Sequence, residues 1–599
     1  MDLRSADVLV IGAGGAGLRA AVTAADQGAH VLLVDKGVVG QTGATFTAAS
    51  DWMAFGAALG HADPADSPRE HWIDILVKGC LVSRPELSRL IAEEAPARFL
   101  ELDEWGARFD RTPDGRYVQK LSDGARFARA AGKGTRTGPA ILGALLGRLG
   151  RINAGPGPGR IEAVSPVAVA DLLVVDGHVL GAWGWRTDDG STVAFSCPAV
   201  VLAAGGAGRA FAVNVFPGCA TGDGYALGLR AGASLVNMEF IQIGPSIVHP
   251  FAFALSGVFW RLSPKVTNAA GEEFLPRYVP QGVDLDEALR LKAVSYPFTV
   301  RNHSMWLDIG VFTEIAEGRG SEHLGVYMDV SHNPAEVLER DAAVPLEHLR
   351  ERGLDFTARA FEFAPAVQHF NGGVTIDEHA ASPVAGLFAA GENAGGQHGA
   401  DRPGGNALAD CQVFGYRAGK SAAEAAGAGR PEPAEVADLA RQAEAADVGD
   451  LARHPQAGPP DQAEGQPSVE ELAARLAWDL WRHASVVRRA EGLRAAVETA
   501  RSVREQVPRA AAAHPWQRRE LGNTALVAEA VARAALLRDE SRGTHYRADC
   551  DTVNDPRWQR QISWRLEGED LRPEVGDPIE PPPELPDLPE RLEAAYGKR

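Results

Sequence analysis

A glycine-rich segment near the N-terminus constrains the fold more than any other part of the chain. An apolar run is followed by the letters GAGGAG at 12–17, an alanine-rich stretch, and a second apolar run that ends at Asp35. This order predicts a strand, a tight turn, a helix and a second strand. Gly12 permits the turn, Gly14 lets the backbone approach a pyrophosphate, and Gly17 lets the helix pack on the strand. Asp35 lies where an acid binds ribose hydroxyls, so the segment predicts dinucleotide binding.

Later glycine-rich turns suggest that several segments meet at one cofactor. A small-residue loop follows the second strand at 37–45, and an apolar strand runs into glycines at 201–206. The letters TGDG at 221–224 open an apolar helix, and another apolar strand reaches glycine at 386–392. Such turns and helix N-termini can offer backbone N–H groups to a phosphate or a ring oxygen. For the loop at 37–45 the alternative is a plain surface connection.

The charge balance and the cysteines exclude several classes of partner. Sixty Lys and Arg against 79 Asp and Glu give a net charge of −19 over 599 residues. This charge argues against a nucleic-acid partner or an anionic membrane surface. No apolar run approaches the ~18 residues of a membrane span, so we expect no membrane insertion. The five cysteines form no CxxC pair, so we expect no metal site and no iron–sulfur cluster in this chain, and a cytoplasmic location.

Several motifs in a fixed order resemble one flavoprotein family. Besides the first glycine segment, they are VLAAGG (201–206), TGDG (221–224), EGRG (317–320), LFAAGE (387–392), HGADR (398–402) and ESRGTHYR (540–547). Together they look like the succinate dehydrogenase, fumarate reductase and L-aspartate oxidase flavoproteins. The resemblance extends from residue 8 to about residue 547.

The resemblance implies an α/β fold with three parts. These are a Rossmann-like FAD-binding domain in two sequence segments, an inserted α+β capping domain and a C-terminal helical bundle. We place the boundaries at 1–234 and 356–430 for the two FAD-binding segments, 235–355 for the capping domain, 431–548 for the helical domain and 549–599 for the tail. Composition predicts a connector with one short helix at 427–468, and little fixed structure beyond docking after Arg572.

The resemblance also implies one bound FAD. The residues that match the family's cofactor motifs are Gly12, Gly14, Gly15, Gly17, Asp35, Lys36, Thr42, Gly43, Ala44, Ala204, Gly205, Asp223, Glu392, Asn406, Ala407 and Leu408. By that similarity Glu392 holds the ribityl chain, and Asn406, Ala407 and Leu408 lie by the isoalloxazine. Membrane-linked members attach the flavin covalently to a histidine in the loop after the second strand. No histidine occurs between Lys36 and Gly60, so we expect non-covalent FAD.

The substrate half departs from the family pattern. Gly244-Pro245-Ser246 replaces a His-Pro-Thr, and Ser256-Gly257 lies where the family has a Thr-Glu pair. Arg301-Asn302-His303 looks more like the adenylylsulfate reductase flavoprotein subunit. The family's His-Tyr before a double glycine is Gln368-His369 here. We therefore expect a small anionic substrate other than succinate or fumarate.

Four side chains are candidates for chemistry on that substrate. Arg402 matches the family arginine that binds a substrate carboxylate, and a guanidinium pairs bidentately with carboxylate; the alternative is a surface arginine. His369 is a candidate donor to a carboxylate or carbonyl oxygen, or a structural histidine. Arg301 and His303 lie where the family places a proton-transfer arginine on the cap. Weaker candidates are His249, Arg261 and His398.

Two functions remain open on the sequence. The first is a soluble FAD-dependent oxidoreductase acting on a small carboxylate, with L-aspartate as the favoured example. It would be an oxidase or an N-hydroxylating monooxygenase that uses dioxygen, with NAD(P)H as a candidate electron donor. The second is the flavoprotein subunit of a fumarate reductase-like or adenylylsulfate reductase-like complex that passes electrons to an iron–sulfur partner. A homo-oligomer is compatible with either.

Overall fold

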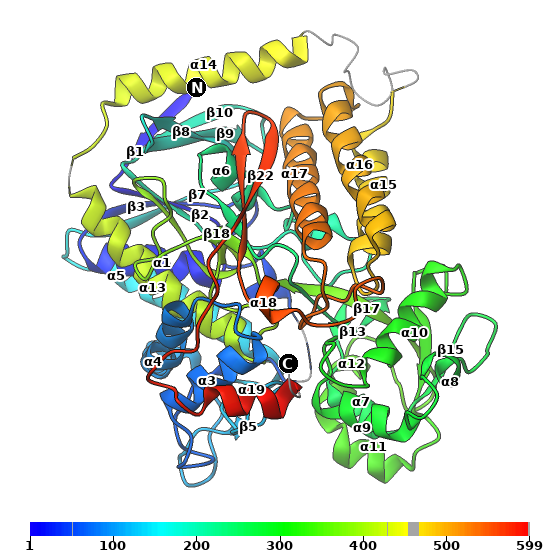
Figure 1. The fold of residues 1–599 in the computed structure, drawn as a ribbon. Coiled ribbons are helices and arrows are strands. Elements are labelled where there is room, and N and C mark those ends of the chain that lie inside the picture. The colour runs from blue at the N-terminus through cyan, green and yellow to red at the C-terminus, as the bar shows by residue number, and fades with distance from the viewer. Residues whose placement is uncertain (49, 51, 428, 453–465, 597–599) are drawn as a thin grey trace.

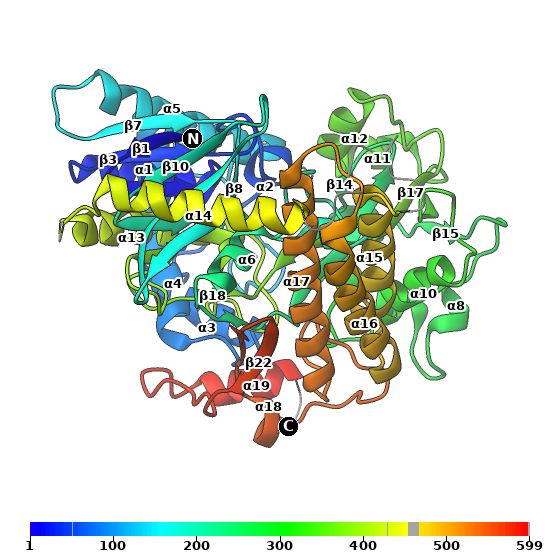
Figure 2. The same cartoon turned by 90° about the horizontal axis from the view of Figure 1, so that it is seen from above.

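A computed structural model describes residues 1–599 except 49, 51, 428, 453–465 and 597–599. Figure 1 shows an α/β body, a group of upright helices beside it, and a separate lobe of short helices and strands drawn in green. The view from above in Figure 2 separates the same three parts. Among the described residues, no helix combines the length and apolar character needed to cross a bilayer.

The body is built on a five-stranded parallel sheet in the order β19-β11-β2-β3-β7. Its strands, in that order, are Leu387–Ala389, Ala199–Leu202, Val8–Ile11, His30–Val34 and Arg160–Val164. All residues of β2, β11 and β19 are buried, as expected for parallel strands that are covered on both faces. The glycine-rich turns at 12–17 and 203–206 both follow the carboxyl ends of these strands, so they meet at one edge of the sheet.

Helices cover this sheet because their small residues allow close packing. α1 (Gly15–Asp26) packs against α13 (Asn406–Ala426). A Cβ on Gly419 would lie 2.3 Å from the carbonyl oxygen of Ala20, so only glycine permits this approach. The other helices of the body are α2 (Ala44–Thr47), α3 (Pro68–Lys78), α4 (Pro85–Leu102), α5 (Thr137–Ala154) and α6 (Asp223–Arg230).

Two further sheets belong to the body. One has the order β1-β10-β9-β8, and the Asp176-Gly177 turn joins β8 to β9 with both residues at positive φ. Its strands are Asp2–Ser5, Thr192–Ser196, His178–Arg186 and Val167–Val175. The small sheet β4-β6-β5 contains Phe55–Gly56, Ala130–Ala131 and Gln119–Lys120.

The green lobe, which we call the cap, contains a mixed set of short elements around the sheet β14-β13-β17-β16-β15. The two long antiparallel strands are β13 (Ile241–His249) and β17 (Phe361–Phe370), which connect the cap to the body. The remaining strands are β14 (Phe253–Ala254), β15 (Lys265–Thr267) and β16 (Val326–Asp329). The helices are α7 (Gly257–Arg261), α8 (Leu275–Tyr278), α9 (Leu285–Val294), α10 (Met305–Ala316), α11 (Ala335–Asp341) and α12 (Ala343–Arg350).

The C-terminal helices pack side by side against the body (Figures 1 and 2). They are α15 (Val469–Ala484), α16 (Ala490–Gln506) and α17 (Pro515–Leu537). α15 begins at a capping box, in which the Ser468 side chain accepts from the Glu471 backbone and the Glu471 side chain accepts from Ser468. The fold class expected from the sequence is thus confirmed, while the boundaries assigned to the domains stay a prediction.

Two irregular segments contain more regular structure than composition predicted. The connector contains α14 (Pro433–Ala452), a 20-residue helix that lies across the β1-β10-β9-β8 sheet, with Val436 and Ala440 buried in its core. The tail after Arg572 is also ordered where it is described. β22 (Asp570–Val575) pairs with β21 (Ile562–Glu567) in the sheet β20-β18-β12-β21-β22. The other strands of this sheet are β12 (Leu235–Val236), β18 (Gly373–Thr375) and β20 (Ala394–Gly395).

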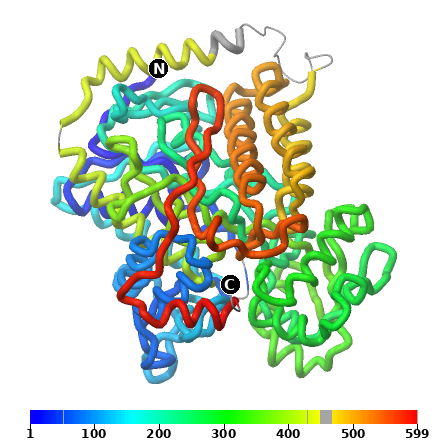
Figure 3. The backbone as a smooth tube through the Cα atoms, viewed as in Figure 1, coloured from blue at the N-terminus to red at the C-terminus, as the bar shows by residue number. Residues whose placement is uncertain are grey.

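The tail then crosses the body and ends in a helix. Figure 3 shows the red trace descending from β22 to α19 (Leu588–Tyr596), which lies against α3; the short α18 (Asp555–Trp558) precedes β21. Arg591 forms an ion pair with Glu70 at 2.7 Å, and the Tyr596 hydroxyl donates to the Val77 carbonyl at 2.6 Å. Proline- and acid-rich composition suggested disorder, but a few apolar and charged contacts with the body fix the helix.

Candidate active site

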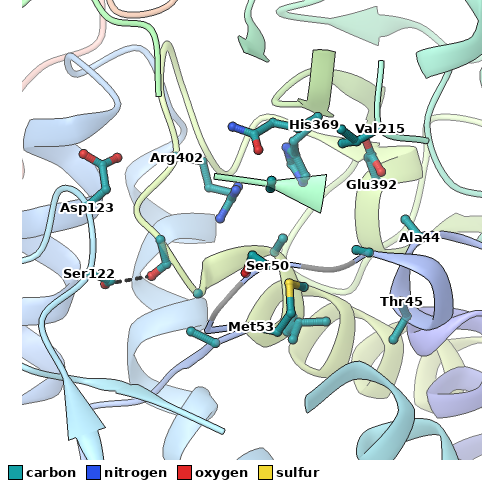
Figure 4. Close-up of a pocket in the computed structure, with 18 of the residues that line it drawn as sticks. Ala44, Thr45, Ser50, Met53, Ser122, Asp123, Val215, His369, Glu392 and Arg402 are labelled. Carbon is teal, nitrogen blue, oxygen red and sulfur yellow. Dashed lines mark hydrogen bonds between the residues drawn. The ribbon is translucent and has the colours of Figure 1, made fainter. Parts of the chain in front are cut away.

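One cavity of about 1420 Å³ joins the glycine-rich edge of the sheet to the cap. Figure 4 shows Arg402, His369 and Glu392 on one side of it, with Ala44 and Thr45 on another. The predicted residues that line it are Gly12, Gly14, Gly15, Asp35, Lys36, Gly43, Ala44, Ala204, Gly205, Asp223, Glu392, Ala407, Leu408, Arg402, His369 and Arg301. Gly17, Thr42, Asn406 and His303 are outside this lining. Cofactor and substrate candidates from distant segments therefore share one space.

The first glycine turn has the shape of a cofactor cradle. Gly12 has φ +103°, and a Cβ there would lie 2.3 Å from the Ala203 carbonyl oxygen. A Cβ on Gly17 would lie 1.8 Å from the Gly12 carbonyl oxygen, so Gly17 closes the helix onto the turn. Gly14 differs, because a Cβ on it would meet no protein atom within 4 Å while the residue faces the cavity. Gly14 thus keeps open a space that a pyrophosphate fits, beside the N-terminus of α1.

Asp35 holds this turn together as well as facing the cavity. Its Oδ2 accepts from the Ala13 N–H at 2.8 Å, and its Oδ1 accepts from the Gly37 N–H at 2.8 Å and the Thr42 hydroxyl at 2.9 Å. Oδ2 has capacity for a further donor, such as a ribose hydroxyl. Thr42 is therefore placed behind Asp35, where it orients the carboxylate.

Lys36 is neutralised by protein carboxylates. Its ammonium lies 2.7 Å from Asp223 and donates to Thr221 at 2.7 Å, and Glu520 of α17 is a third partner. Burial lowers the pKa of Lys36, but the two carboxylates outweigh burial and raise this pKa above its usual value. The ammonium therefore joins the glycine turn, α6 and the C-terminal helices beside the cavity.

Glu392 is a half-buried acid in the cavity wall. Its Oε1 accepts from the Phe370 N–H at 2.8 Å. Burial raises the pKa of Glu392 to about 8, so at neutral pH the group is mostly protonated and can donate a hydrogen bond. A Cβ on Gly206 would lie 2.4 Å from Glu392 Oε1, which explains the second glycine of that motif.

Arg402 supplies a positive charge, and its guanidinium donates to neutral acceptors. Its Nη1 donates to the Pro403 carbonyl at 2.8 Å and its Nη2 to Gln242 Oε1 at 2.5 Å, and both of these acceptors are neutral. The Nε has no hydrogen-bond partner among the described residues. Burial lowers the pKa of Arg402, although a guanidinium keeps its charge. An anion in the cavity would satisfy both the charge and the free N–H.

His369 lies beside Arg402 and is neutral. Its Nδ1 is 3.2 Å from Asn371 Oδ1, and its ring contacts that of His398 edge-on at 5.5 Å between centroids. Burial, with contributions from the Arg402 and His398 charges, holds the pKa of His369 well below its usual range. With Nδ1–H donated to Asn371, Nε2 is an acceptor. The other tautomer would present a donor.

The structure separates the two cap candidates. Arg301 lines the cavity, and its guanidinium stacks over the Tyr596 ring at 5.7 Å. Burial lowers the pKa of Arg301, but Tyr596, Asp401 and Asp123 raise it above its usual value. His303, by contrast, is exposed and outside the cavity lining. Arg301 therefore faces the site from the cap, and His303 stays a prediction, since it is not among the residues that line the cavity.

A buried ionic cluster near Arg402 was not predicted from the sequence. Lys78 of α3 pairs with Asp123 and lies 2.8 Å from Asp401, and these three side chains are at most 1% exposed. Asp401 precedes Arg402, and its Oδ1 accepts from the Arg402 N–H at 2.9 Å. The cluster therefore fixes the loop that carries Arg402. Its residues come from three distant segments, so no sequence spacing signals it.

Comparison with known proteins places this geometry in a family. A family model described as an FAD binding domain matches residues 7–408, and one described as the fumarate reductase flavoprotein C-terminal domain matches 474–579. The chain belongs to the fumarate reductase and succinate dehydrogenase flavoprotein family. It is therefore an FAD-dependent oxidoreductase, as the sequence predicted.

The family relatives match along nearly the whole chain. One subunit of the fumarate reductase (CoM/CoB) of Methanothermobacter marburgensis is 35% identical, over 94% of this chain and 97% of the relative. L-Aspartate oxidase of Pseudomonas aeruginosa is 28% identical, over 91% and 95%. The structure of Mycobacterium smegmatis Sdh1 in complex with UQ1 is 31% identical, with a TM-score of 0.84 over 100% and 99%. An adenosine-5-phosphosulfate reductase structure, 20% identical with a TM-score of 0.71 over 97% of each chain, shares the fold.

Proposed function

We propose that this protein transfers a hydride between non-covalent FAD and a carbon atom of a small carboxylate. The observation that carries the proposal is Arg402, which faces the same cavity as the glycine cradle and whose Nε has no hydrogen-bond partner among the described residues. An acidic chain needs a local positive charge to bind an anionic substrate. Arg402 supplies it next to the cofactor segments.

The surrounding side chains have distinct roles in this proposal. FAD, when bound, supplies the hydride-accepting or hydride-donating ring. Arg402 binds and orients the substrate carboxylate through a charge-assisted pair. His369 is neutral, and in the tautomer that carries the proton on Nε2 it donates a hydrogen bond to a second substrate oxygen. Arg301 reaches the cavity from the cap, where it exchanges a proton with the substrate while the cap limits access of water.

The flavin is non-covalent in this proposal because the attachment residue is absent. The loop that faces the cavity contains Gly43 and Ala44, and residues 36–60 contain no histidine. Acid precipitation should release yellow FAD into the supernatant. Colour that stays with the pellet would show another attachment residue.

The favoured electron path is exchange with a separate iron–sulfur protein. The 35% identical relative is named as one part of a fumarate reductase, and this chain matches almost all of its length. The described cysteines form no disulfide, and no cysteine pair has cluster spacing. Fumarate thereby returns as a candidate substrate, although Gly244 and Ser256 replace family side chains.

A self-contained enzyme acting on L-aspartate is the second candidate. It is supported by the L-aspartate oxidase relative and by the altered dicarboxylate positions. In that case dioxygen accepts the electrons, and NAD(P)H is a candidate donor if the reaction is a hydroxylation. The cytoplasm is the location that fits either path.

An anaerobic flavin assay distinguishes the two candidates. Reduced protein is mixed with fumarate, and oxidised protein with succinate or L-aspartate, while flavin absorbance is recorded. Reoxidation by fumarate supports function within a multi-subunit reductase. Reduction by L-aspartate, followed by peroxide formation when dioxygen is admitted, supports the oxidase. No response to any small carboxylate would refute the proposal.

A further inference from the structure

Three side chains at the outer end of the cap form a cluster with metal-ligand chemistry. They are His249 at the end of β13, His323 in the loop before β16, and Glu362 near the start of β17. One ligand atom from each lies within 4.8 Å of the others. The sequence predicted no metal site, because these residues lie on three separate segments and show no ligand spacing.

Hydrogen bonds hold two of the three groups in place. His323 Nδ1 lies 3.1 Å from Glu362 Oε1 and 3.2 Å from Oε2. The Ser321 hydroxyl also contacts Glu362 and accepts from the His323 N–H at 3.3 Å and the Gly325 N–H at 3.2 Å. The loop 321–325 is therefore fixed on the carboxylate, and a metal ion between His323 Nδ1 and Glu362 would take the place of the proton that they share.

His249 is the third member of the cluster and lies on its exposed side. The His249 ring stacks on His323 with 3.6 Å between centroids and 12° between planes. His249 is exposed and free to turn toward a shared ion. Glu322, 3.9 Å from His323 Nε2, adds a second carboxylate beside the cluster.

We propose that His249, His323 and Glu362 bind a divalent transition-metal ion such as Zn²⁺. Two imidazoles with one carboxylate suit zinc and its neighbours better than magnesium or calcium, which prefer sets of oxygen ligands. None of the three residues is among those that line the cavity, as far as the chain is described. The ion would act outside the redox site.

The bound ion would join three segments of the cap. His249 and Glu362 are paired in register across β13 and β17, and farther along the same two strands Gln242 is paired with His369. The metal would thus close the outer end of the strand pair whose inner end supplies two side chains near Arg402. Its expected effect is to stabilise the cap against local opening.

The test uses untagged FAD-loaded protein that has been treated with EDTA and desalted. Zn²⁺ is added, unbound metal is removed, and bound zinc is measured by mass spectrometry, with affinity from competition against a chromophoric chelator. We expect roughly one equivalent per chain and a higher Tm. His249→Ala, His323→Ala and Glu362→Gln should each weaken affinity by at least about tenfold. His332→Ala, which removes another exposed cap histidine, is the matched control and should bind as the wild type does.

Flavin absorbance reports whether each variant is folded. The inference is overturned if wild-type protein retains no zinc, or if the three ligand variants retain as much as the control. Glu362→Gln keeps the side-chain size and an oxygen acceptor for Ser321. Loss of zinc in a Glu362→Gln variant with normal Tm before zinc addition separates ligation from folding.

Discussion

Two regions beside the cavity each contain a lysine between two carboxylates. In the cofactor region Lys36 pairs with Asp223 and Glu520, and its side chain is 19% exposed. In the substrate region Lys78 pairs with Asp123 and Asp401, and its side chain is 0% exposed. The same arrangement thus serves a partly hydrated cofactor site and a dry wall behind Arg402. The loop that carries Arg402 therefore depends on ion pairs that water cannot reach, so water cannot solvate a charge that loses its partner there.

The largest expected effect follows from breaking the dry cluster. Lys78→Met removes the ammonium paired with the buried carboxylates of Asp123 and Asp401, which should reduce the free energy of unfolding by about 3–5 kcal/mol. Lys36→Met is the matched variant, and its smaller loss should reflect solvent access. Denaturant unfolding of the FAD-loaded proteins measures both. Adding Asp123→Asn and Asp401→Asn to Lys78→Met should restore most of the loss; equal losses for the two lysines would contradict the comparison.

A second variant pair sharpens the cofactor side. Gly17→Ala places a Cβ 1.8 Å from the Gly12 carbonyl oxygen, so the turn must shift at a cost of about 1–3 kcal/mol or more. Gly14→Ala meets no protein atom within 4 Å, so it should fold normally and lose FAD affinity only. Thermal unfolding of apoprotein and FAD titration separate the two results. Normal FAD affinity in Gly14→Ala would remove that residue from the cofactor site.

The third prediction concerns the substrate side. Arg402→Ala should retain FAD and lose about 1.5–3 kcal/mol of interaction with the substrate carboxylate, or roughly tenfold to a hundredfold in affinity. Arg402→Lys keeps the charge but not the paired N–H geometry, so it should recover only part of the loss. The measurement is the rate of flavin reduction or reoxidation by the active carboxylate. Wild-type kinetics in Arg402→Ala would exclude the residue.

Sequence predicted the cofactor side better than the substrate side, and distance along the chain explains why. Gly12, Gly14 and Gly17 lie within a few residues of one another, so the local sequence is sufficient to predict the turn. Lys78 and Asp401 meet only after folding, and no spacing predicts a pair separated by hundreds of residues. Composition also failed for the tail, where α19 docks through Tyr596 and a few charged contacts.

The family resemblance identified Arg402 and Arg301 correctly as cavity residues but also selected His303, which is exposed. Neighbouring side chains in a loop point in different directions, and a sequence motif does not predict which of them faces the cavity. The parallel sheet, the cap and the C-terminal helices were predicted from ordered motifs. Helix α14 was predicted too short, because alanine and acids occur in connectors and helices alike.

The smallest expected effect concerns Glu392. Its pKa is raised to about 8 by burial, so Glu392→Gln should change FAD affinity at pH 7 by less than about tenfold, because Gln resembles the protonated acid. Because the pKa of Glu392 in the folded protein lies above its ordinary value of 4.5, the folded state binds this proton more tightly than the unfolded state does. The resulting stabilisation is fully present below pH 4.5. This stabilisation is lost as the pH rises through about 8. Unfolding from pH 5 to 9 should therefore show a decline in the wild type that Glu392→Gln flattens.

The most direct test of the central claim is carboxylate binding beside the flavin. Oxidised, FAD-loaded protein is titrated with malonate, a small dicarboxylate that does not exchange a hydride, and the flavin absorbance spectrum is recorded. The wild type should show a saturable spectral change, and Arg402→Ala should require about tenfold to a hundredfold more malonate. An identical titration curve for the two proteins would contradict the account.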